Sequence, residues 1–384
     1  MNRALLAACL AFWTAAANAE EAIKVGLIAP FSGAFADSGR QMDLGIKAYL
    51  KLHGDRVAGK KVQVLLKDTT GPVPEVAKRL AQELVVREKV DFLAGFGLTP
   101  EALAVADVAT QAKKPMIVMN AATSIITTKS PYIARVSMTL PQNTVPLAQW
   151  AVKNGIQSVF TLVADYAPGI DAENAFRKAF TAAGGRIIDS VRTPLRDPEF
   201  SPFIQRVKDA KPQALFVFLP AGQGIGFMKG VRERGLPEAG IKIIATGDVT
   251  DDHVLDAMGD VALGMITSFH YSAAHDSPEN KKFLKACEEV GAGIGRPNFM
   301  AVGAFDGMAA IFEVARKLNG KIDGDRAMEV LKGLRLASPR GTISIDPETR
   351  DVVQTVYLRK VEKVGDHYYN VEFDKVPDVK DPGK

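Results

Sequence analysis

The feature that most constrains this chain is an alternation of short apolar strands and amphipathic helices, which runs through the sequence twice. The first series of predicted strands comprises Ile23–Ala29, Lys61–Lys67, Asp91–Gly95 and Pro115–Met119. The second series comprises Val159–Ala164, Arg186–Val191, Ala214–Leu219 and Lys242–Thr246. Such alternation is typical of βαβ units in parallel sheets covered by helices on both faces. Because 384 residues exceed what one core holds, we expect an α/β fold with two doubly wound, Rossmann-like lobes.

Further elements are predicted after the second series. Helical periodicity covers about 278–291, 299–318 and 324–333, and a late strand follows at Val352–Val361. A simple tandem of two lobes does not need these elements. We therefore expect the chain to return to the first lobe and to cross over once more. From Lys375 onward the sequence is rich in Asp, Lys and Pro, and we expect it to be frayed.

The first residues predict export. Arg3 precedes an uncharged apolar run that is too short to span a bilayer, and the Ala17–Ala19 run fits the small-x-small cleavage pattern. We predict a signal peptide over residues 1–19, cleavage before Glu20 and a periplasmic mature protein. An uncleaved anchor and lipid attachment at Cys9 are the alternatives.

Composition and motifs exclude several classes of function. The 48 basic and 44 acidic residues are interspersed, without the basic cluster that nucleic-acid binding needs. The sequence contains no GxSxG, HExxH or Walker A motif, and its five histidines lack metal-ligand spacing. Cys287, the one cysteine of the mature chain, lies in an amphipathic helix and is predicted to be a buried structural thiol.

Polar loops follow the predicted strands of both lobes. Thr99, as a helix N-cap, would present free N–H groups to an anion, although an ordinary cap is the alternative. Loop 120–124 follows the next strand, and the second lobe offers loops 165–169, 221–223 and 247–249. Open α/β sheets bind ligands at this carboxyl edge, so the loops predict a ligand site between the lobes.

Six longer motifs carry a resemblance to a known family. In chain order they are VGLIAPFSGAFADSGRQMDLGIKA, GFGLTPEA, PMIVMNAATS, ADYAPGIDAE, SFHYSAAHDSPENKKF and PNFMAVGAFDGM. Together, behind a signal peptide, they resemble the periplasmic substrate-binding proteins of ABC importers, in the branched-chain amino acid (Leu/Ile/Val)-binding family. The resemblance covers essentially all of the mature chain. It implies a type I periplasmic binding protein, in which three hinge crossovers join two lobes that close on ligand.

The family also implies lobe boundaries and partners. The N-terminal lobe would comprise 20–141 plus 272–345, and the C-terminal lobe 142–271 plus 346–384. We expect a monomer that takes a small carboxylate to permease subunits in the inner membrane, with no cofactor, metal or nucleic acid.

The resemblance carries over to individual residues. Thr99 matches the hydroxyl residue that binds a ligand carboxylate, and Ala121 and Thr123 match the neighbouring backbone and hydroxyl contacts. Asp248 matches the region that supplies an acid for an α-ammonium group.

Other positions depart from the pattern of amino-acid receptors. Ser38, predicted to cap a helix that runs to about Leu52, stands where an aromatic residue often precedes the glycine. Phe305 replaces a frequent aromatic on a first-lobe helix. Pro168 takes the place of a tyrosine that binds the ammonium group. Since a buried ammonium needs several acceptors, this loss favours the subgroup that takes up benzoate derivatives.

Aromatic side chains near these loops fit a flat ligand. Tyr166 and His270 are predicted to contact it, as are Phe31 and Phe35, for which core packing is the alternative. Gln223, at a strand end, is a further candidate.

Three functions remain open from the sequence. The favoured one is a non-enzymatic receptor for an aromatic carboxylate, with an amino acid as the alternative ligand. A ligand-binding partner of a signalling receptor belongs to another class. An enzyme on the same fold would use Asp165, Asp248 or His270 as acid or base.

Overall fold

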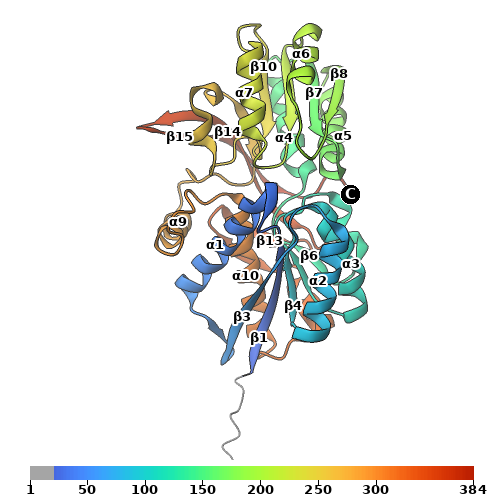
Figure 1. The fold of residues 1–384 in the computed structure, drawn as a ribbon, viewed down its shortest axis with the longest axis vertical. Helices are drawn as coiled ribbons and strands as arrows, with labels where there is room; N and C mark the ends of the chain where they lie inside the picture. The colour runs from blue at the N-terminus through green and yellow to red at the C-terminus, as the bar shows by residue number, and fades with distance from the viewer. Residues whose placement is uncertain (1–20) are drawn as a thin grey trace, which may run out of the picture.

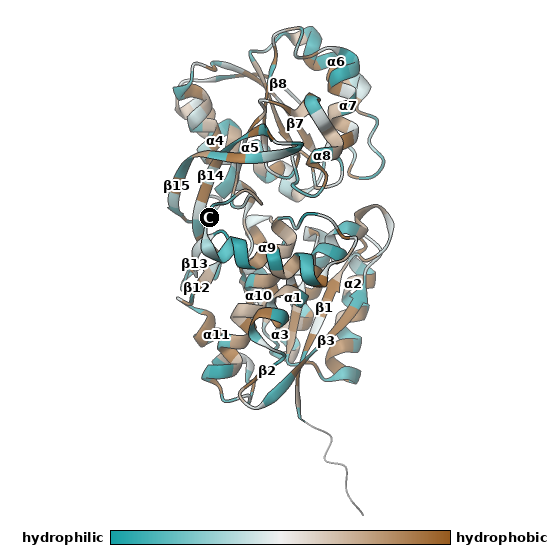
Figure 2. Cartoon of the chain, turned by 90° about the vertical axis from the view of Figure 1, so that its left-hand side faces the viewer, coloured by the Kyte–Doolittle hydropathy of each residue, from teal (hydrophilic) through white to brown (hydrophobic). Residues whose placement is uncertain are grey.

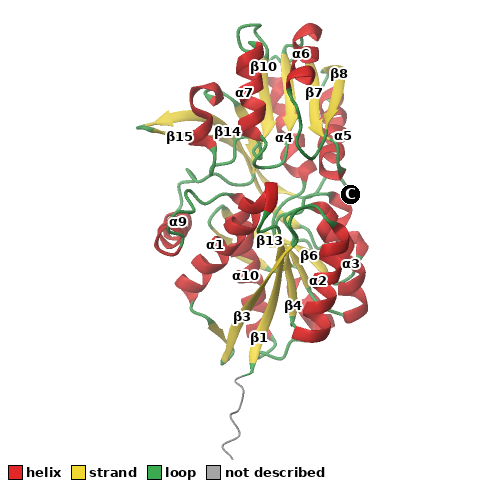
Figure 3. Cartoon of the chain, viewed as in Figure 1, coloured by secondary structure: helices red, strands yellow, loops and turns green. Residues whose placement is uncertain are grey.

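The computed structural model describes residues 21–384, which form two α/β lobes stacked along the long axis (Figure 1). The predicted signal peptide, its cleavage site before Glu20, and Cys9 lie outside the described residues. In each lobe the strands lie at the centre and the helices cover them (Figure 3). The predicted α/β class with two mainly parallel sheets is confirmed.

The first lobe is built on a six-stranded sheet with the order β2-β3-β1-β4-β5-β6. Its strands are β1 (Ala22–Ala29), β2 (Arg56–Val57), β3 (Lys60–Asp68), β4 (Phe92–Gly95), β5 (Met116–Val118) and β6 (Ile133–Arg135). Its helices are α1 (Ala36–His53), α2 (Pro74–Glu83), α3 (Thr99–Ala112), α9 (Pro278–Val290), α10 (Phe299–Lys317) and α11 (Gly324–Leu331). All pairings are parallel except that of the short edge strand β2.

The second lobe is built on β14-β11-β10-β9-β7-β8, with β15 paired to β14. Its strands are β7 (Ser158–Ala164), β8 (Arg186–Thr193), β9 (Ala214–Phe218), β10 (Lys242–Thr246), β11 (Ile266–Phe269), β14 (Val352–Val364) and β15 (His367–Val379). Its helices are α4 (Leu140–Lys153), α5 (Ala167–Ala182), α6 (Ser201–Ala210), α7 (Gly224–Arg234) and α8 (Leu255–Met258). Shorter helical turns are η1 (Gly33–Phe35), η2 (Leu84–Glu88), η3 (Ser124–Lys129) and η4 (Gly259–Ala262).

The late helices return to the first lobe, as the sequence predicts. Helix α10 is buried along most of its length and packs against α1. A Cβ atom on Gly45 of α1 would lie 1.9 Å from the carbonyl oxygen of Ala301, so this close approach requires glycine. Most helices carry their hydrophobic residues toward the sheets and their polar residues outward (Figure 2).

Three segments connect the lobes, between β6 and α4, between β11 and α9, and between β13 (Gly341–Ile345) and β14. The hairpin of β12 (Arg335–Ser338) and β13 lies with the first lobe (Figure 2). Strand β14 pairs with β13 at Val352 and Val353, and farther along it pairs with β11 in the second lobe. One strand therefore ties the two lobes together.

Several local predictions are wrong. Ser38, expected to cap a helix, lies inside α1, because the turn Gly33–Phe35 precedes that helix. Thr99 is the first residue of α3, and Leu98 holds the N-cap position. Of the segment expected to fray from Lys375, residues Lys375–Val379 belong to β15, where Lys375 lies opposite Tyr357 of β14.

Within residues 21–384, none of the helices combines the length and the apolar character that crossing a membrane would require. Cys287 is buried on α9, as predicted.

Candidate ligand-binding site between the lobes

A small cavity lies where loops of both lobes meet. The loops that form it follow β4 and β5 in the first lobe and β7, β9 and β10 in the second. The lining residues are Phe35, Ser38, Gly97, Leu98, Thr99, Asn120, Ala121, Ala122, Met138, Leu140, Tyr166, Pro168, Phe218, Pro220, Ala221, Asp248 and Met300. The site thus occupies the carboxyl edge of both sheets, where ligands bind in open α/β folds.

Two threonine hydroxyls meet on the first-lobe side. The Oγ1 atoms of Thr99 and Thr123 lie 3.0 Å apart, within hydrogen-bond distance, and both side chains are buried. Thr99 begins α3, and Thr123 follows β5 through the loop after Asn120. The structure therefore brings this predicted pair together, and hydroxyl donors at a helix start suit a carboxylate.

Glu101 caps the helix, so the Thr99 hydroxyl does not have to. The Glu101 carboxyl accepts a hydrogen bond from the backbone N–H of Leu98 at 3.0 Å and another from the Thr69 hydroxyl. Burial raises the pKa of Glu101 to about 7. This arrangement leaves the Thr99 hydroxyl to Thr123 and to the cavity.

Hydrogen bonds from neighbouring side chains hold the loop that carries Thr123 in place. The Asn120 side-chain amide donates to the carbonyl oxygen of Gly97 at 2.6 Å. The guanidinium of Arg135, on β6, donates to the carbonyl oxygens of Ala121 at 2.8 Å and Thr123 at 2.9 Å. These bonds orient the ligand-facing loop before any ligand arrives.

An acidic group faces the cavity from the second lobe. Asp248 follows β10 and is 5% exposed, and its Oδ2 atom has no hydrogen-bond partner among residues 21–384. Burial raises the pKa of Asp248 to about 7. Together with burial, the Asp248 charge also raises the pKa of the Tyr166 phenol. A buried oxygen without a partner is costly, so a polar ligand group is the natural occupant of this position.

Apart from Ser38 and Asn120, the rest of the cavity wall is apolar and aromatic. Tyr166 stacks on Phe218, with ring centroids 6.1 Å apart. Phe35, Met138 and Met300 are buried and line the same space. Among the described lining residues, Asp248 is the only charged side chain, so an anionic ligand would be held by neutral donors.

Not every predicted site residue reaches the cavity. The structure places Ser38, Thr99, Ala121, Tyr166, Pro168 and Asp248 on its wall, whereas Thr123 is not a lining residue and reaches the site through its contact with Thr99. The Gln223 side chain donates to the Leu195 carbonyl oxygen at 2.8 Å and lines two neighbouring hollows instead. His270 is buried beside Phe269, with ring centroids 4.4 Å apart, and burial lowers its pKa well below the usual range.

The prediction for Phe305 needs correction. Its ring packs in the first-lobe core, 5.1 Å from that of Tyr49 and 5.2 Å from that of Phe283. The α10 residue on the cavity wall is Met300. Because an α-helix turns about 100° per residue, a residue five positions later points about 140° away.

Sequence reasoning missed several lining residues. Phe218 ends β9 directly before the predicted loop at Ala221, so the rule about strand ends could have found it. Met138 and Leu140 come from the first crossover between the lobes, and no local sequence signal points to them.

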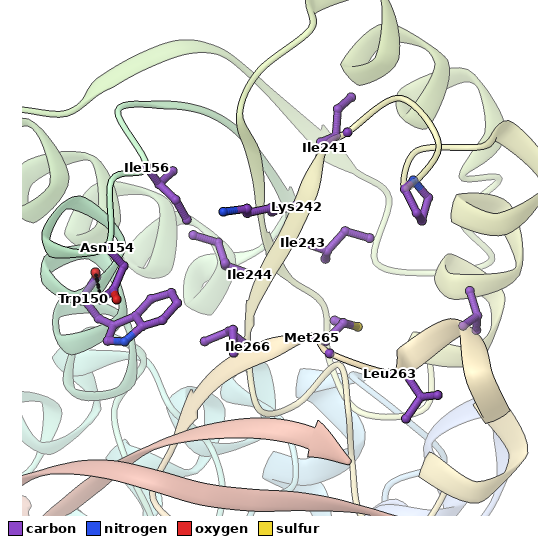
Figure 4. Close-up of a pocket in the computed structure, with 14 residues that line it drawn as sticks. Trp150, Asn154, Ile156, Ile241, Lys242, Ile243, Ile244, Leu263, Met265 and Ile266 are labelled. Atoms are coloured by element: carbon purple, nitrogen blue, oxygen red, sulfur yellow. Dashed lines mark hydrogen bonds between the residues drawn. The ribbon is translucent and has the colours of Figure 1, made fainter. Parts of the chain in front are cut away.

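A second hollow opens within the C-terminal lobe beside α4, β10 and β11 (Figure 4). Its wall includes Trp150, Ile244 and Ile266, and Lys242 is the charged side chain among its lining residues. It draws on one lobe alone, with Asn154, Lys242 and the Trp150 indole as its polar side chains, so the cavity between the lobes is the better candidate for a ligand held by both lobes.

Two α/β lobes that face each other across a cavity at their carboxyl edges define a two-lobed solute-binding protein. A family model described as periplasmic binding protein matches residues 22–366. The chain belongs to this family, and the predicted resemblance is confirmed.

Similar proteins include a curated relative and two solved structures. The Leu/Ile/Val-binding protein homolog 6 of Brucella melitensis biotype 1 is 46% identical, covering 100% of this chain and 99% of the relative. A solute binding protein of an ABC transporter from Rhodopseudomonas palustris BisB5, in complex with 3,4-dihydroxy benzoic acid, is 56% identical with a TM-score of 0.92, covering 94% of this chain and 99% of that one. Another from Rhodopseudomonas palustris HaA2, in complex with p-hydroxybenzoic acid, is 45% identical with a TM-score of 0.93, over the same shares of the two chains.

Proposed function

We propose that this chain is the receptor of an ABC importer and binds a hydroxylated benzoate between its lobes. The observation that carries the proposal is the distribution of polar and apolar side chains around the cavity. Two paired hydroxyls stand on one lobe, an unpartnered carboxyl oxygen stands on the other, and apolar or aromatic side chains lie around them. An aromatic ring with a carboxylate and a hydroxyl has this distribution of groups.

In this arrangement each lobe recognises one part of the ligand. Thr99 and Thr123 donate hydrogen bonds to the carboxylate, and Asp248 meets a ring hydroxyl. Because its pKa lies at about 7, Asp248 can accept from that hydroxyl when ionised or donate to it when protonated. Tyr166 and Phe218 offer ring faces. The two similar solute-binding proteins with hydroxylated benzoates support the same ligand class.

An amino acid is the second candidate. The similarity to the Leu/Ile/Val-binding homologue favours an amino acid weakly. Asp248 could pair with the α-ammonium group of such a ligand. Against it, Pro168 lines the cavity where amino-acid receptors are expected to carry a tyrosine, and within residues 21–384 Asp248 is the only acidic lining residue. A buried ammonium would then lack acceptors.

A thermal-shift panel tests the ligand class. Binding to the native state raises Tm with ligand concentration. We expect 4-hydroxybenzoate and 3,4-dihydroxybenzoate to raise Tm and leucine to leave it unchanged. The reverse pattern would establish the amino-acid receptor. Recovery of unaltered ligand after prolonged incubation tests the non-enzymatic role, since an enzyme would yield product.

The proposal extends to cellular context. A signal peptide over residues 1–19, cut before Glu20, would deliver a monomeric receptor to the periplasm, where it passes ligand to the permease. Residues 20–141 plus 272–345 would move as one lobe, and 142–271 plus 346–384 as the other. Mass spectrometry of the periplasmic protein would reveal the cleavage site.

A further inference from the structure

We propose that residues Lys380–Lys384, here called the strap, hold the ligand-facing loop Ala121–Ser124 in its binding position. The strap follows β15 and ends where the two lobes meet (Figure 1). The expected effect of the strap on ligand affinity rests on the proposed function. The contacts between the strap and the loop are independent of that proposal.

The strap is anchored at both ends. Where it begins, the Val379 carbonyl oxygen accepts a hydrogen bond from the Gln142 side chain of α4 at 2.9 Å. The Lys380 ammonium lies 2.8 Å from Asp346, after β13. Where it ends, the Lys384 ammonium contacts both Asp351 and Thr127. The strap therefore spans the first and third crossovers between the lobes.

Asp381 joins the strap to the ligand-facing loop. Its Oδ1 atom accepts hydrogen bonds from the Ser124 hydroxyl at 3.0 Å, the Thr139 hydroxyl at 2.9 Å and the Gly383 N–H at 2.9 Å. Ser124 directly follows Thr123, and Thr139 caps α4 at the first crossover. One carboxylate oxygen thus ties the loop to the start of the second lobe.

The strap also lies close against Ser124. A Cβ atom on Gly383 would sit 2.3 Å from the Ser124 Oγ and 3.0 Å from a ring carbon of Pro141. A larger residue would therefore displace the Ser124 hydroxyl from Asp381.

A buried ion pair completes the support. Arg135 donates through Nε to Asp351 at 2.7 Å, while its Nη1 donates to the Ala121 and Thr123 carbonyl oxygens. Both charged side chains are almost fully buried, and Lys384 contacts the second oxygen of Asp351. The strap thereby adds a second cation to the carboxylate that positions Arg135.

The same loop touches the second lobe. The Ser124 N–H donates to the Asp171 carboxylate of α5 at 3.0 Å, and burial together with the charge of Asp381 raises the pKa of Asp171. Ser124 is therefore held by the strap and by α5 at once. Asp381 and the strap act as positioning groups for ligand binding, without touching the ligand.

The test compares Asp381→Ala with Asp381→Asn and with Lys375→Ala as control. Asparagine keeps the Oδ1 acceptor that receives the three hydrogen bonds, whereas alanine removes it. Lys375 is exposed on β15 and lies outside the strap. In calorimetric titrations with 4-hydroxybenzoate, we expect affinity to fall on the order of tenfold in D381A and to stay near wild type in D381N and K375A.

A second measurement needs no ligand. Hydrogen exchange of the backbone amides of residues 121–128 should be faster in D381A than in the wild type, and unchanged in D381N and K375A. If D381A does not fold, Gly383→Ala and Lys384→Met carry the same expectation. Wild-type exchange and wild-type affinity in variants that fold would overturn the strap. A wild type that does not bind 4-hydroxybenzoate would instead refute the proposed ligand, while the exchange data would still decide on the strap.

Discussion

The hydroxyl pair of Thr99 and Thr123 offers the sharpest test of how the site recognises a carboxylate. Thr→Val replaces a hydroxyl by a methyl group of similar size, so it removes the donor and leaves the shape. A hydrogen bond to a charged group contributes about 1.5–3 kcal/mol, and the bond between the two hydroxyls, 3.0 Å long, offsets about 1 kcal/mol of this. We therefore expect each substitution to cost about 0.5–2 kcal/mol, or roughly 2- to 30-fold in affinity.

Calorimetry of T99V, T123V and the double variant with 4-hydroxybenzoate measures this effect. Because the bond between the hydroxyls offsets part of each single loss but is broken only once, the double variant should lose more than the sum of the single losses, by about 1 kcal/mol. Thr110→Val is the matched control: its hydroxyl bonds the Ala106 carbonyl oxygen at 2.9 Å on the same helix, outside the cavity wall, and affinity should not change. Wild-type affinity in both T99V and T123V would refute the assignment.

Other predictions concern charge and lobe closure. Because burial raises the pKa of Asp248 from about 4 to about 7, protonation favours the folded state, and this stabilisation is lost as the pH rises through 7. Asp248→Asn should therefore raise Tm more at pH 8 than at pH 5, as differential scanning calorimetry would reveal; an equal shift at both pH values would contradict this. With 4-hydroxybenzoate, D248N should still bind, whereas an ammonium ligand would lose nearly all affinity. Arg296, from the loop before α10, donates to the Tyr368 carbonyl oxygen at 2.7 Å and lies 3.1 Å from Asp256 in the second lobe. Arg296→Ala should enlarge the ligand-free radius of gyration in small-angle scattering, with saturating ligand restoring it; identical curves for variant and wild type would exclude this role.

The sequence predicts the fold well where periodicity is strong and contacts are local. The strand Ile23–Ala29 lies within the observed β1, since the uncharged run Val25–Ala29 suits a strand buried on both faces. The sequence does not predict strand β15, because its residues from Lys375 mix Lys, Asp and Pro with two valines and are mostly exposed. Its pairing with β14 comes from the hairpin partner, which local composition does not encode.

The site residues likewise fall into those that the sequence predicts and those that only the folded structure reveals. Thr99, Thr123 and Asp248 follow strands, so the rule about carboxyl edges places them near the cavity. Phe305 could not be placed without the rotational phase of α10. The contact between Ser124 and Asp381 joins residues 257 positions apart, and only the folded chain reveals it.

The most direct test of the central claim is calorimetric titration of the wild-type protein, first with 4-hydroxybenzoate and then, on fresh protein, with leucine. The account predicts saturable binding of one 4-hydroxybenzoate per chain and only heat of dilution with leucine. Saturable binding of leucine, with no response to 4-hydroxybenzoate, would contradict it.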